Sequence, residues 1–310
     1  MVSGAKAVPT QSKGAKTIAL TAKATDPTSP GGPSRIAAAE WFMGTDPGPG
    51  HGVAMAAVDG VFNSTVESIR GSVPTAHVAY GEHLVGIRAR DAAGNWGSPV
   101  ILAISVTPAD VLFADGFESG TLGRWTRAAG GGRLRVLASV ATGGRWGLEA
   151  ALSGAGAAYV ADGSPAAATR YRARFTMTTG STTTGGAGVV VFSGIDGRGA
   201  AIFRLQLRRS TGGRPQVRLL VARLGGTSAT TWLTVSDAAT SLQVSWSAAA
   251  GARPSLLVNG VTLRSVAAVD TSRYRLEEVR LGPSGGLKPG LAGTLAFDRF
   301  VSDRVTSLGL

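Results

Sequence analysis

Residues 170–175 read RYRARF, and this stretch sets the pattern for most of the chain. Side chains alternate between the two faces of a strand, so Tyr171 and Phe175 fall on one face and the arginines on the other. The same period of two returns in IFRLQLRR at 202–209 and in LQVSWS at 242–247. We find no apolar pattern of helical period longer than two turns. The sequence therefore predicts an all-β fold.

Turn signals separate the expected strands throughout the chain. SLLVNGVTLRSV at 255–266 predicts a hairpin, because Asn-Gly suits the tight turn between two strands. Residues 17–107 alternate short strand-like runs with turns rich in proline and glycine, a spacing typical of a β-sandwich. We therefore expect two β-domains, 17–107 and 111–303, joined by a short linker at 108–110.

The first of these domains resembles a known family. AAEWFMGTDPGPGHGVAMAAVDGVF at 38–62 and GEHLVGIRARDAAGNWGSP at 81–99 closely resemble the immunoglobulin-like or fibronectin III-like modules of secreted bacterial proteins. The resemblance covers nearly all of residues 17–107. It implies a β-sandwich and an extracellular setting, and it implies no activity.

The second domain resembles another family at its two ends. LFADGFESGTLGRWT at 112–126, LLVNGVTL at 256–263 and GTLAFDRFVSDR at 293–304 look like parts of a concanavalin A-like or laminin G-like jelly roll. That family includes lectins, carbohydrate-binding modules, adhesive domains and some glycosidases and lyases. The expected fold class is therefore all-β, with an N-terminal Ig-like sandwich and a C-terminal jelly-roll sandwich.

The two ends of the chain have the composition of tails. Residues 1–16 are small, polar and basic, which predicts a flexible segment unless something holds it. An extended segment of this kind can add to an open sheet edge of a neighbouring copy, so we expect it to dock there and form a homo-oligomer or polymer. Residues 304–310 are expected to be a C-terminal tail. No run of about 18 apolar residues predicts a transmembrane segment, and the expected location is secreted or cell surface.

Positive charge gathers in the second domain. Residues 1–108 carry eight Lys or Arg and seven Asp or Glu, whereas residues 109–310 carry 23 and 12. All of these 23 cations except Lys288 are arginines, whose planar guanidinium binds carboxylate, sulfate and phosphate well. Six of them fall on outward positions of strands expected to be neighbours: Arg172, Arg174, Arg204, Arg208, Arg218 and Arg223.

Arginines paired across a sheet repel one another unless an anion lies on them. We therefore expect this face to bind an acidic polysaccharide, cell-envelope phosphate or an acidic protein face, with a solvated basic face as the alternative. Only 6% of the residues are aromatic, and we expect the tryptophans of the second domain to lie mostly in the core: Trp125, Trp146, Trp232 and Trp246. Since no aromatic residue alternates with the arginines to stack on bases, nucleic acid is not an expected partner.

Few residues suit catalysis. The chain has no cysteine, which excludes a thiol nucleophile, and its three histidines are His51, His77 and His83. A glycosidase needs two carboxylates on one face of the sheet, whereas Glu277 and Glu278 are adjacent and point to opposite faces. No catalytic residue is therefore predicted, and we expect the chain not to be an enzyme.

A structural calcium ion is the expected cofactor. In jelly rolls of the resembled kind the first DGFESG turn and the last FDRF strand lie side by side. Calcium binds six to eight hard oxygens, and Asp115, Glu118 and Asp298 are the carboxylates available there. The alternative is that Asp115 caps a turn and Asp298 pairs with a nearby arginine.

These features lead to two hypotheses about function. The first is a non-enzymatic extracellular structural or adhesive surface protein that assembles into a filament or surface layer through its tail. The second is the carbohydrate-binding accessory region of a larger secreted hydrolase.

Overall fold

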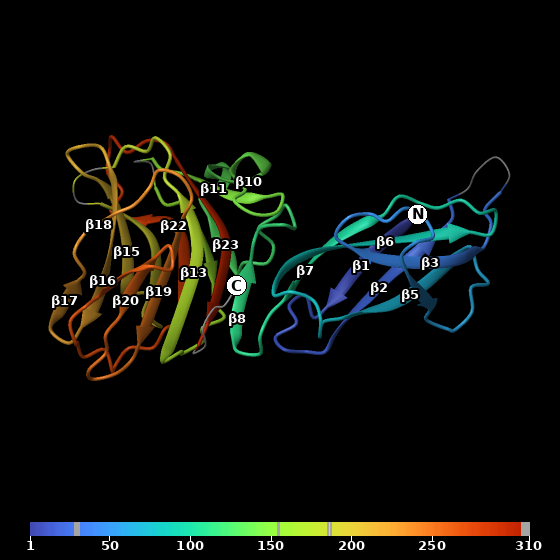
Figure 1. Ribbon diagram of the computed structural model, residues 1–310, viewed down its shortest axis with the longest axis horizontal. Coiled ribbons are helices and arrows are strands. Elements are labelled where there is room, and N and C mark those ends of the chain that lie inside the picture. Colours follow the sequence, from blue (N-terminus) through green and yellow to red (C-terminus); the bar gives the residue numbers. More distant parts are fainter. Residues whose placement is uncertain (28–31, 154–155, 185, 187, 305–310) are drawn as a thin grey trace. The chain divides into compact units, whose positions relative to one another are not determined.

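The structure is a computed structural model, and it describes residues 1–27, 32–153, 156–184, 186 and 188–304. It divides into two compact units, of which the first is Met1–Ala109 and the second begins at Asp110. Strands make up both units, and helical structure in the described residues is limited to two single 3₁₀ turns (Figure 1). The all-β prediction is confirmed. All but Arg304 of the C-terminal tail expected at 304–310 lies outside the described residues.

The first unit is a sandwich built from one continuous path of hydrogen-bonded strands. In its described residues the strands are β1 (Val2–Val8), β2 (Thr17–Thr25), β3 (Ile36–Met43), β4 (Val53–Ala57), β5 (Val66–Pro74), β6 (Gly81–Asp91) and β7 (Val100–Val106). They pair in the order β1-β2-β5-β4-β3-β6-β7. β4 joins the two halves, because residues 53–55 pair with β3 whereas Ala56 and Ala57 pair with β5.

The core of the first unit lies between these halves. Ile18 and Leu20 of β2 and Ile69 of β5 are fully buried, as are Ile87 of β6 and Ile104 of β7. Each of these side chains lies on the inward face of an alternating strand, so the period of two in the sequence decides which face is buried.

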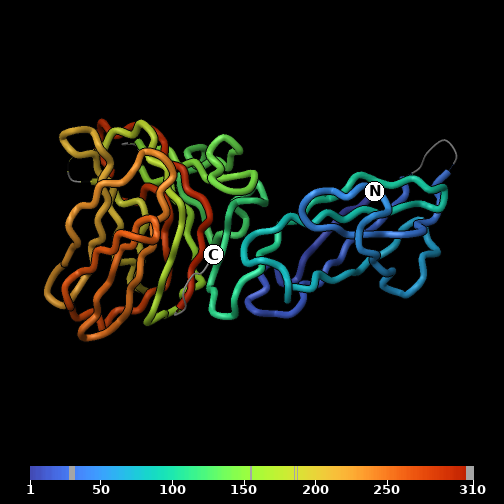
Figure 2. The backbone as a smooth tube through the Cα atoms, in the orientation of Figure 1, coloured from blue at the N-terminus to red at the C-terminus, as the bar shows by residue number. Residues whose placement is uncertain are grey.

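The basic N-terminal segment belongs to the first unit and is not a free tail. β1 pairs antiparallel with β2, and the start of the chain runs within the first unit (Figure 2). Val2 and Ala7 are buried in the core of the unit. Beyond β1, the backbone N–H of Ser12 donates to Ser105 O and that of Gly14 to Thr107 O, both at 2.8 Å. The prediction of a flexible docking tail over residues 1–16 is corrected accordingly. Main-chain hydrogen bonds hold the segment whatever its side-chain composition, while Lys6 stays exposed.

The second unit contains two eight-stranded sheets, which we name the β13 sheet and the β15 sheet. The β13 sheet has the order β10 (Leu134–Leu137), β11 (Gly147–Ala151), β23 (Thr294–Asp303), β13 (Arg170–Thr178), β19 (Thr240–Ser247), β20 (Ser255–Val258) and β21 (Thr262–Ser265), with β8 (Val111–Asp115) paired to β23. The β15 sheet has the order β17 (Gly226–Ala229), β16 (Pro215–Arg223), β15 (Ala201–Arg209), β14 (Val189–Ile195), β22 (Glu278–Gly285), β12 (Tyr159–Asp162) and β9 (Arg127–Ala129), with β18 (Leu233–Thr234) paired to β16. The 3₁₀ turns η1 (Gly131–Arg133) and η2 (Ala138–Val140) flank β10.

Aromatic side chains join the inner faces of these two sheets. Phe175 of β13 contacts Phe192 of β14 with ring centroids 5.1 Å apart, and Tyr171 of β13 stacks on Phe203 of β15 at 6.3 Å. All four rings are buried in one continuous core. The second unit is therefore a two-layered sandwich whose outer faces carry the residues that alternate with these aromatics.

Gly194 on β14 makes room for one of these rings. A Cβ atom placed there would collide with the ring of Phe203 and with Leu276. We expect Gly194→Ala to destabilise the second unit by about 1–3 kcal/mol, the usual cost of overpacking a filled core. Chemical denaturation of the full chain, followed by core tryptophan fluorescence, measures the effect. Gly251→Ala is the matched control, since a Cβ there would meet nothing within 4 Å. Equal stability of the two variants would contradict the prediction.

Candidate functional site

The six predicted arginines lie on two different sheets. Arg172 and Arg174 are on β13, whereas Arg204 and Arg208 are on β15 and Arg218 and Arg223 on the adjacent β16. β13 pairs with β19 and β23, so it does not neighbour β15. The expectation that all of these strands are neighbours is therefore corrected to two groups on separate sheets. The alternating pattern places five of the arginines outward, whereas Arg223 has the same phase as the buried Val221, and the pattern does not determine which sheet a strand joins.

On the outer face of the β15 sheet, two arginines share one tryptophan. The guanidinium carbons of Arg208 and Arg218 lie 4.1 and 4.4 Å from the ring centroid of Trp232. Arg208 Nε donates to Gln216 Oε1 and Arg218 Nε to Gln206 Oε1, both at 3.0 Å. Each glutamine lies directly opposite its arginine on the neighbouring strand. We call these five residues the Trp232 surface.

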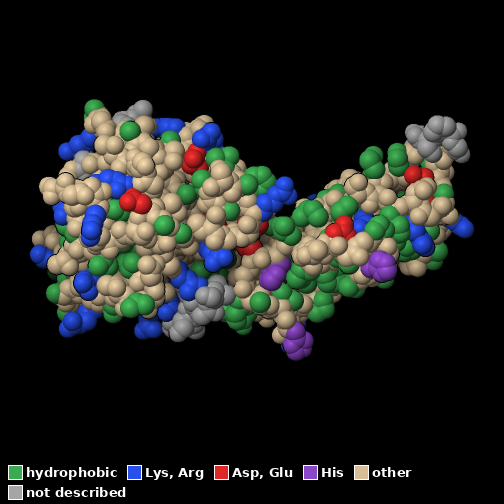
Figure 3. All heavy atoms as spheres, turned by 45° about the horizontal axis from the view of Figure 1, so that its top comes forward, with side chains coloured by type: hydrophobic (Ala, Val, Ile, Leu, Met, Phe, Trp, Pro, Cys, Tyr) green, Lys and Arg blue, Asp and Glu red, His purple; other side chains and the backbone are tan. Residues whose placement is uncertain are grey.

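The Trp232 surface keeps its positive charge. In the described part of the chain, Arg204, Arg208 and Arg218 form no ion pair with a carboxylate. Burial, and then the charge of Arg208, lower the pKa of Arg218 from its ordinary value. Two like charges held this close favour a bound anion. Figure 3 shows the wider setting, with many Lys and Arg side chains and few Asp and Glu on the visible face of the second unit.

Trp232 corrects an expectation from the sequence. It is half-buried on the outer face, where we expected a core residue, and it does lie among arginines. A Cβ at Gly188 would approach the indole to 3.0 Å, so the absence of a side chain there leaves room for the ring. The available signal was the run ATTWLT at 229–234, in which three threonines lie within two residues of the tryptophan.

The other two arginines of this group have different surroundings. Arg204 lies opposite Leu220 on β16 and Ser193 on β14, so it extends the outer face towards β22. Arg223 closes the turn between β16 and β17, where its Nε donates to Ser228 Oγ at 3.1 Å and its Nη1 to Leu224 O at 3.1 Å. Arg223 is thus a turn residue and does not join the Trp232 surface.

Farther along the same face lies a second group of arginines that the sequence reasoning missed. Arg127 and Arg280 both lie over the ring of Tyr159, at 5.6 and 5.0 Å, and both pair with Glu278, at 2.6 and 2.7 Å. Arg127 also donates to the Tyr159 hydroxyl at 3.1 Å. Burial alone would raise the pKa of Glu278, but the hydrogen bonds from Arg127 and Arg280 outweigh burial and lower it. This group is partly neutralised, unlike the Trp232 surface.

The arginines on β13 are fixed differently. Arg172 binds Asp303 through Nε and Nη2, at 3.2 and 3.1 Å, and the carboxylate is fully buried. Burial, and then the charges of Arg299 and Arg172, lower the pKa of Arg174. The outer face of the β13 sheet therefore also concentrates positive charge.

The three predicted calcium ligands lie near the β8–β23 pairing, where Asp115 is opposite Phe300. Asp298 Oδ2 accepts hydrogen bonds from Thr142 N, Thr142 Oγ1 and Gly143 N at 2.7, 3.0 and 3.0 Å. Glu118 accepts from the backbone N–H of Arg145 and Trp146. Both carboxylates thus hold the loop that follows η2.

Asp115 is also engaged as an acceptor. Its Oδ1 accepts from Phe117 N at 3.0 Å and its Oδ2 from Trp125 Nε1 at 2.7 Å, and burial raises its pKa. Nowhere in residues 1–27, 32–153, 156–184, 186 and 188–304 do three Asp, Glu or His side chains group closely enough to hold a metal ion. Calcium stays a prediction, and in this structure N–H and O–H donors occupy oxygens that would bind it.

Comparisons with known proteins find similarity to solved structures alone. No family model matches it, and no curated protein matches it significantly. Among solved structures it is similar to alginate lyase Aly36B, at 14% identity over 64% of this chain and 95% of that one, with a TM-score of 0.42. The carbohydrate esterase of the Shiga toxin-encoding bacteriophage phi24B matches at 10% identity over 63% and 99% of the two chains, with a TM-score of 0.45.

A third structure spans almost the whole chain. The GH43 protein BlXynB of Bacillus licheniformis matches at 10% identity over 98% of this chain and 65% of that one, with a TM-score of 0.45. Because a lyase and an esterase are among the neighbours, the prediction that this chain is not an enzyme is wrong, and we withdraw it. Likeness at this level assigns no reaction to the chain. The described residues also include no helix long and apolar enough to cross a membrane.

The ion pairs of Glu278 give a pH-dependent contribution to stability. Its pKa in the folded chain is lowered, so this contribution is complete above the unfolded value of about 4.3 and is lost as the pH falls through the folded value. We expect the stability difference between the wild type and Glu278→Gln to shrink as the pH falls below about 4.3. Urea unfolding across this range measures it. In an Arg127→Gln background the pH dependence should be smaller, and an unchanged dependence would rule out this ion pair as its source.

The calcium prediction has its own test. If Asp115, Glu118 and Asp298 hold calcium, excess chelator should lower the unfolding temperature of the second unit, and Asp298→Ala should abolish that sensitivity. A ligand at a hundredfold excess over its Kd stabilises the folded state by about 2.7 kcal/mol. Scanning calorimetry with calcium and with chelator measures the difference. If the wild type unfolds at the same temperature with calcium and with chelator, hydrogen bonds alone hold the loop.

Proposed function

We propose that the second unit binds acidic polysaccharide through the outer face of the β15 sheet, as the carbohydrate-binding region of a larger secreted hydrolase. One observation carries this proposal. Arg208 and Arg218 lie over Trp232 with no carboxylate partner in the described residues. The site therefore offers a fixed pair of positive charges beside an aromatic side chain.

The chemistry of the Trp232 surface suits a charged saccharide. Guanidinium groups form paired hydrogen bonds with carboxylate and sulfate, and the amides of Gln206 and Gln216 can bind hydroxyl groups. Arg204 extends the positive face towards β22. A ligand with a charge on successive units can engage several of these positions at once, whereas a single small anion can engage only one.

The wider architecture supports an accessory role. The strand order of the first unit, with β4 shared between two halves, is the arrangement we propose to be Ig-like, and the two-layered second unit is the proposed jelly roll. We propose an extracellular location on the same grounds. Structural calcium at Asp115, Glu118 and Asp298 is a separate proposal that this function does not need.

The competing hypothesis, a structural subunit that polymerises through its N-terminal tail, loses its main support. That segment already forms β1 and pairs with β2 and β7 of its own unit. The segment is therefore held within its own unit, and the accessory hypothesis is preferred.

Binding measurements test the proposed function. We expect the full chain to bind a polyuronate and not a neutral glucan. Arg208→Gln with Arg218→Gln should weaken binding at least about tenfold, equivalent to 1.4 kcal/mol, because charge-assisted hydrogen bonds contribute about 1.5–3 kcal/mol each. Trp232→Ala should weaken it as well. Affinity electrophoresis or calorimetry at fixed ionic strength provides the values.

The control has the same change in net charge. Arg198→Gln with Arg264→Gln removes two exposed arginines away from the Trp232 surface and should leave affinity nearly unchanged. Three results would overturn the proposal: equal binding of the neutral glucan, equal losses in both double variants, or tighter binding of single-stranded DNA than of polyuronate.

A further inference from the structure

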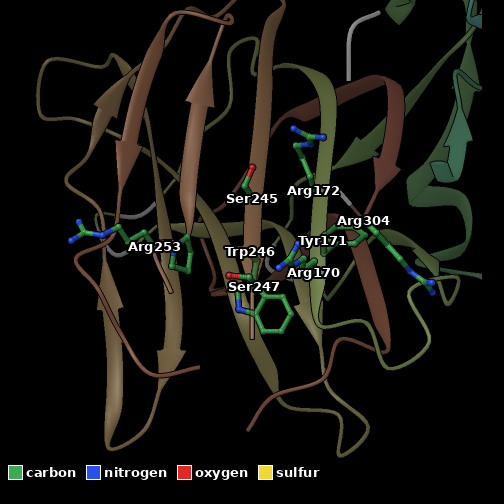
Figure 4. A pocket seen from close by; sticks show the side chains of 9 residues that line it. Arg170, Tyr171, Arg172, Ser245, Trp246, Ser247, Arg253 and Arg304 are labelled. Atoms are coloured by element: carbon green, nitrogen blue, oxygen red, sulfur yellow. The ribbon is translucent and has the colours of Figure 1, made fainter. Parts of the chain in front are cut away.

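A pocket on the β13 sheet forms a second concentration of donors. Its volume is about 220 Å³, and six of its lining residues carry the argument: Arg170, Arg172, Ser245, Ser247, Arg253 and Arg304. Figure 4 shows that these side chains come from β13, from β19, from the segment before β20 and from the end of β23. Three separate segments of the chain thus place arginines around one hollow, and β19 adds two serines.

Strand register builds the base of this pocket. Arg170 lies directly opposite Ser247 and Arg172 directly opposite Ser245 on the paired strands β13 and β19. All four residues occupy the outward positions that alternate with the core residues Tyr171 and Trp246. Small hydroxyl side chains therefore lie beside long cationic ones, which leaves the space that the pocket occupies.

The charges around the pocket are mostly uncompensated. Arg172 is held by the buried Asp303, and its side chain is only 19% exposed. Within the described residues, Arg170, Arg253 and Arg304 form no ion pair. One fixed guanidinium and three exposed ones thus face a single carboxylate that lies beneath the surface. Farther along β13, burial, and then the charges of Arg299 and Arg172, lower the pKa of Arg174.

Donors outnumber acceptors around this pocket. Guanidinium groups donate hydrogen bonds but cannot accept them. The pocket is therefore rich in donors and poor in acceptors, which favours a ligand with several acceptor oxygens and a negative charge.

We propose that this pocket binds a single carboxylate-bearing sugar unit, a uronate. Ligand pockets for larger molecules usually measure about 300–1,000 Å³, so the smaller volume here suits one sugar ring better than a longer segment. The arginines bind the carboxylate, and the serine hydroxyls bind hydroxyl groups of the ring. This site shares no residue with the Trp232 surface and lies on the other sheet, so it does not depend on the function proposed above.

Two sites on separate sheets would change how the second unit holds a polymer. The outer faces of a two-layered sandwich point in opposite directions, so the two sites can engage two different saccharide chains. A particle with many copies of the ligand is then bound more tightly than either site alone allows, since the second contact forms at a high effective concentration.

Titration of the full chain with glucuronate, glucose and inorganic sulfate tests the pocket. Nuclear magnetic resonance should show shifts of the Trp246 indole N–H and the Ser245 and Ser247 amides with glucuronate, and none with glucose. Arg170→Gln with Arg253→Gln should raise the Kd for glucuronate at least about tenfold. Both arginines are exposed, so an unchanged unfolding temperature verifies that this variant folds.

Controls make each outcome decisive. Arg198→Gln with Arg264→Gln, which changes the net charge equally, should leave the glucuronate Kd within about twofold. The proposal is overturned if glucuronate shifts none of these signals, if the pocket variant binds as well as the wild type, or if sulfate binds as tightly as glucuronate. The polyuronate measurement on the Trp232 surface uses other variants, so either proposal can fail alone.

Discussion

The contact between Phe175 and Phe192, 5.1 Å between ring centroids, joins the two sheets of the second unit, and the rest of that unit follows from it. Once Tyr171 and Phe175 are committed to the inner face of β13, the period of two forces Arg172 and Arg174 outward. The same constraint acts on β15, where burial of Phe203, Leu205 and Leu207 leaves Arg204 and Arg208 outside. The basic outer faces are thus a direct result of the aromatic core.

Neighbouring side chains then decide which of these charges can act on a ligand. Glu278 neutralises part of the charge of Arg127 and Arg280, and buried Asp303 does the same for Arg172. Asp303 lies opposite Arg172 on the neighbouring strand, whereas the residues opposite Arg208 and Arg218 are glutamines. Their amides orient the guanidinium groups without cancelling the positive charge. A carboxylate at either glutamine would close the site to anions, so the amide is the chemically important choice.

Local sequence patterns predicted the positions of the strands, but they did not predict which strands pair with one another. The alternation at 170–175 and at 202–209 lies in β13 and β15, and the Asn259-Gly260 turn joins β20 to β21, with positive φ of 52° and 70° at its two residues. The arginines of β13 and β15 look alike in sequence, yet they lie on different sheets, because pairing partners are set by distant residues. Composition was misleading in two places. We expected Trp232 to lie in the core, although the threonines beside it in the sequence indicate exposure. We also expected a flexible N-terminal tail from its basic composition, although main-chain hydrogen bonds hold this segment.

The N-terminal segment has a mechanical consequence. Residues 10–14 run parallel to the end of β7, with hydrogen bonds from Ser105 N to Thr10 O, from Ser12 N to Ser105 O and from Gly14 N to Thr107 O. A force applied at the two ends of the first unit acts parallel to residues 10–14 and to the end of β7. It therefore loads these hydrogen bonds at the same time, in shear, and they cannot break one after another. The barrier to forced unfolding, and not the equilibrium stability, then sets how long the first unit survives under tension. A sandwich closed in this way is suited to transmit force between whatever is attached at its two ends.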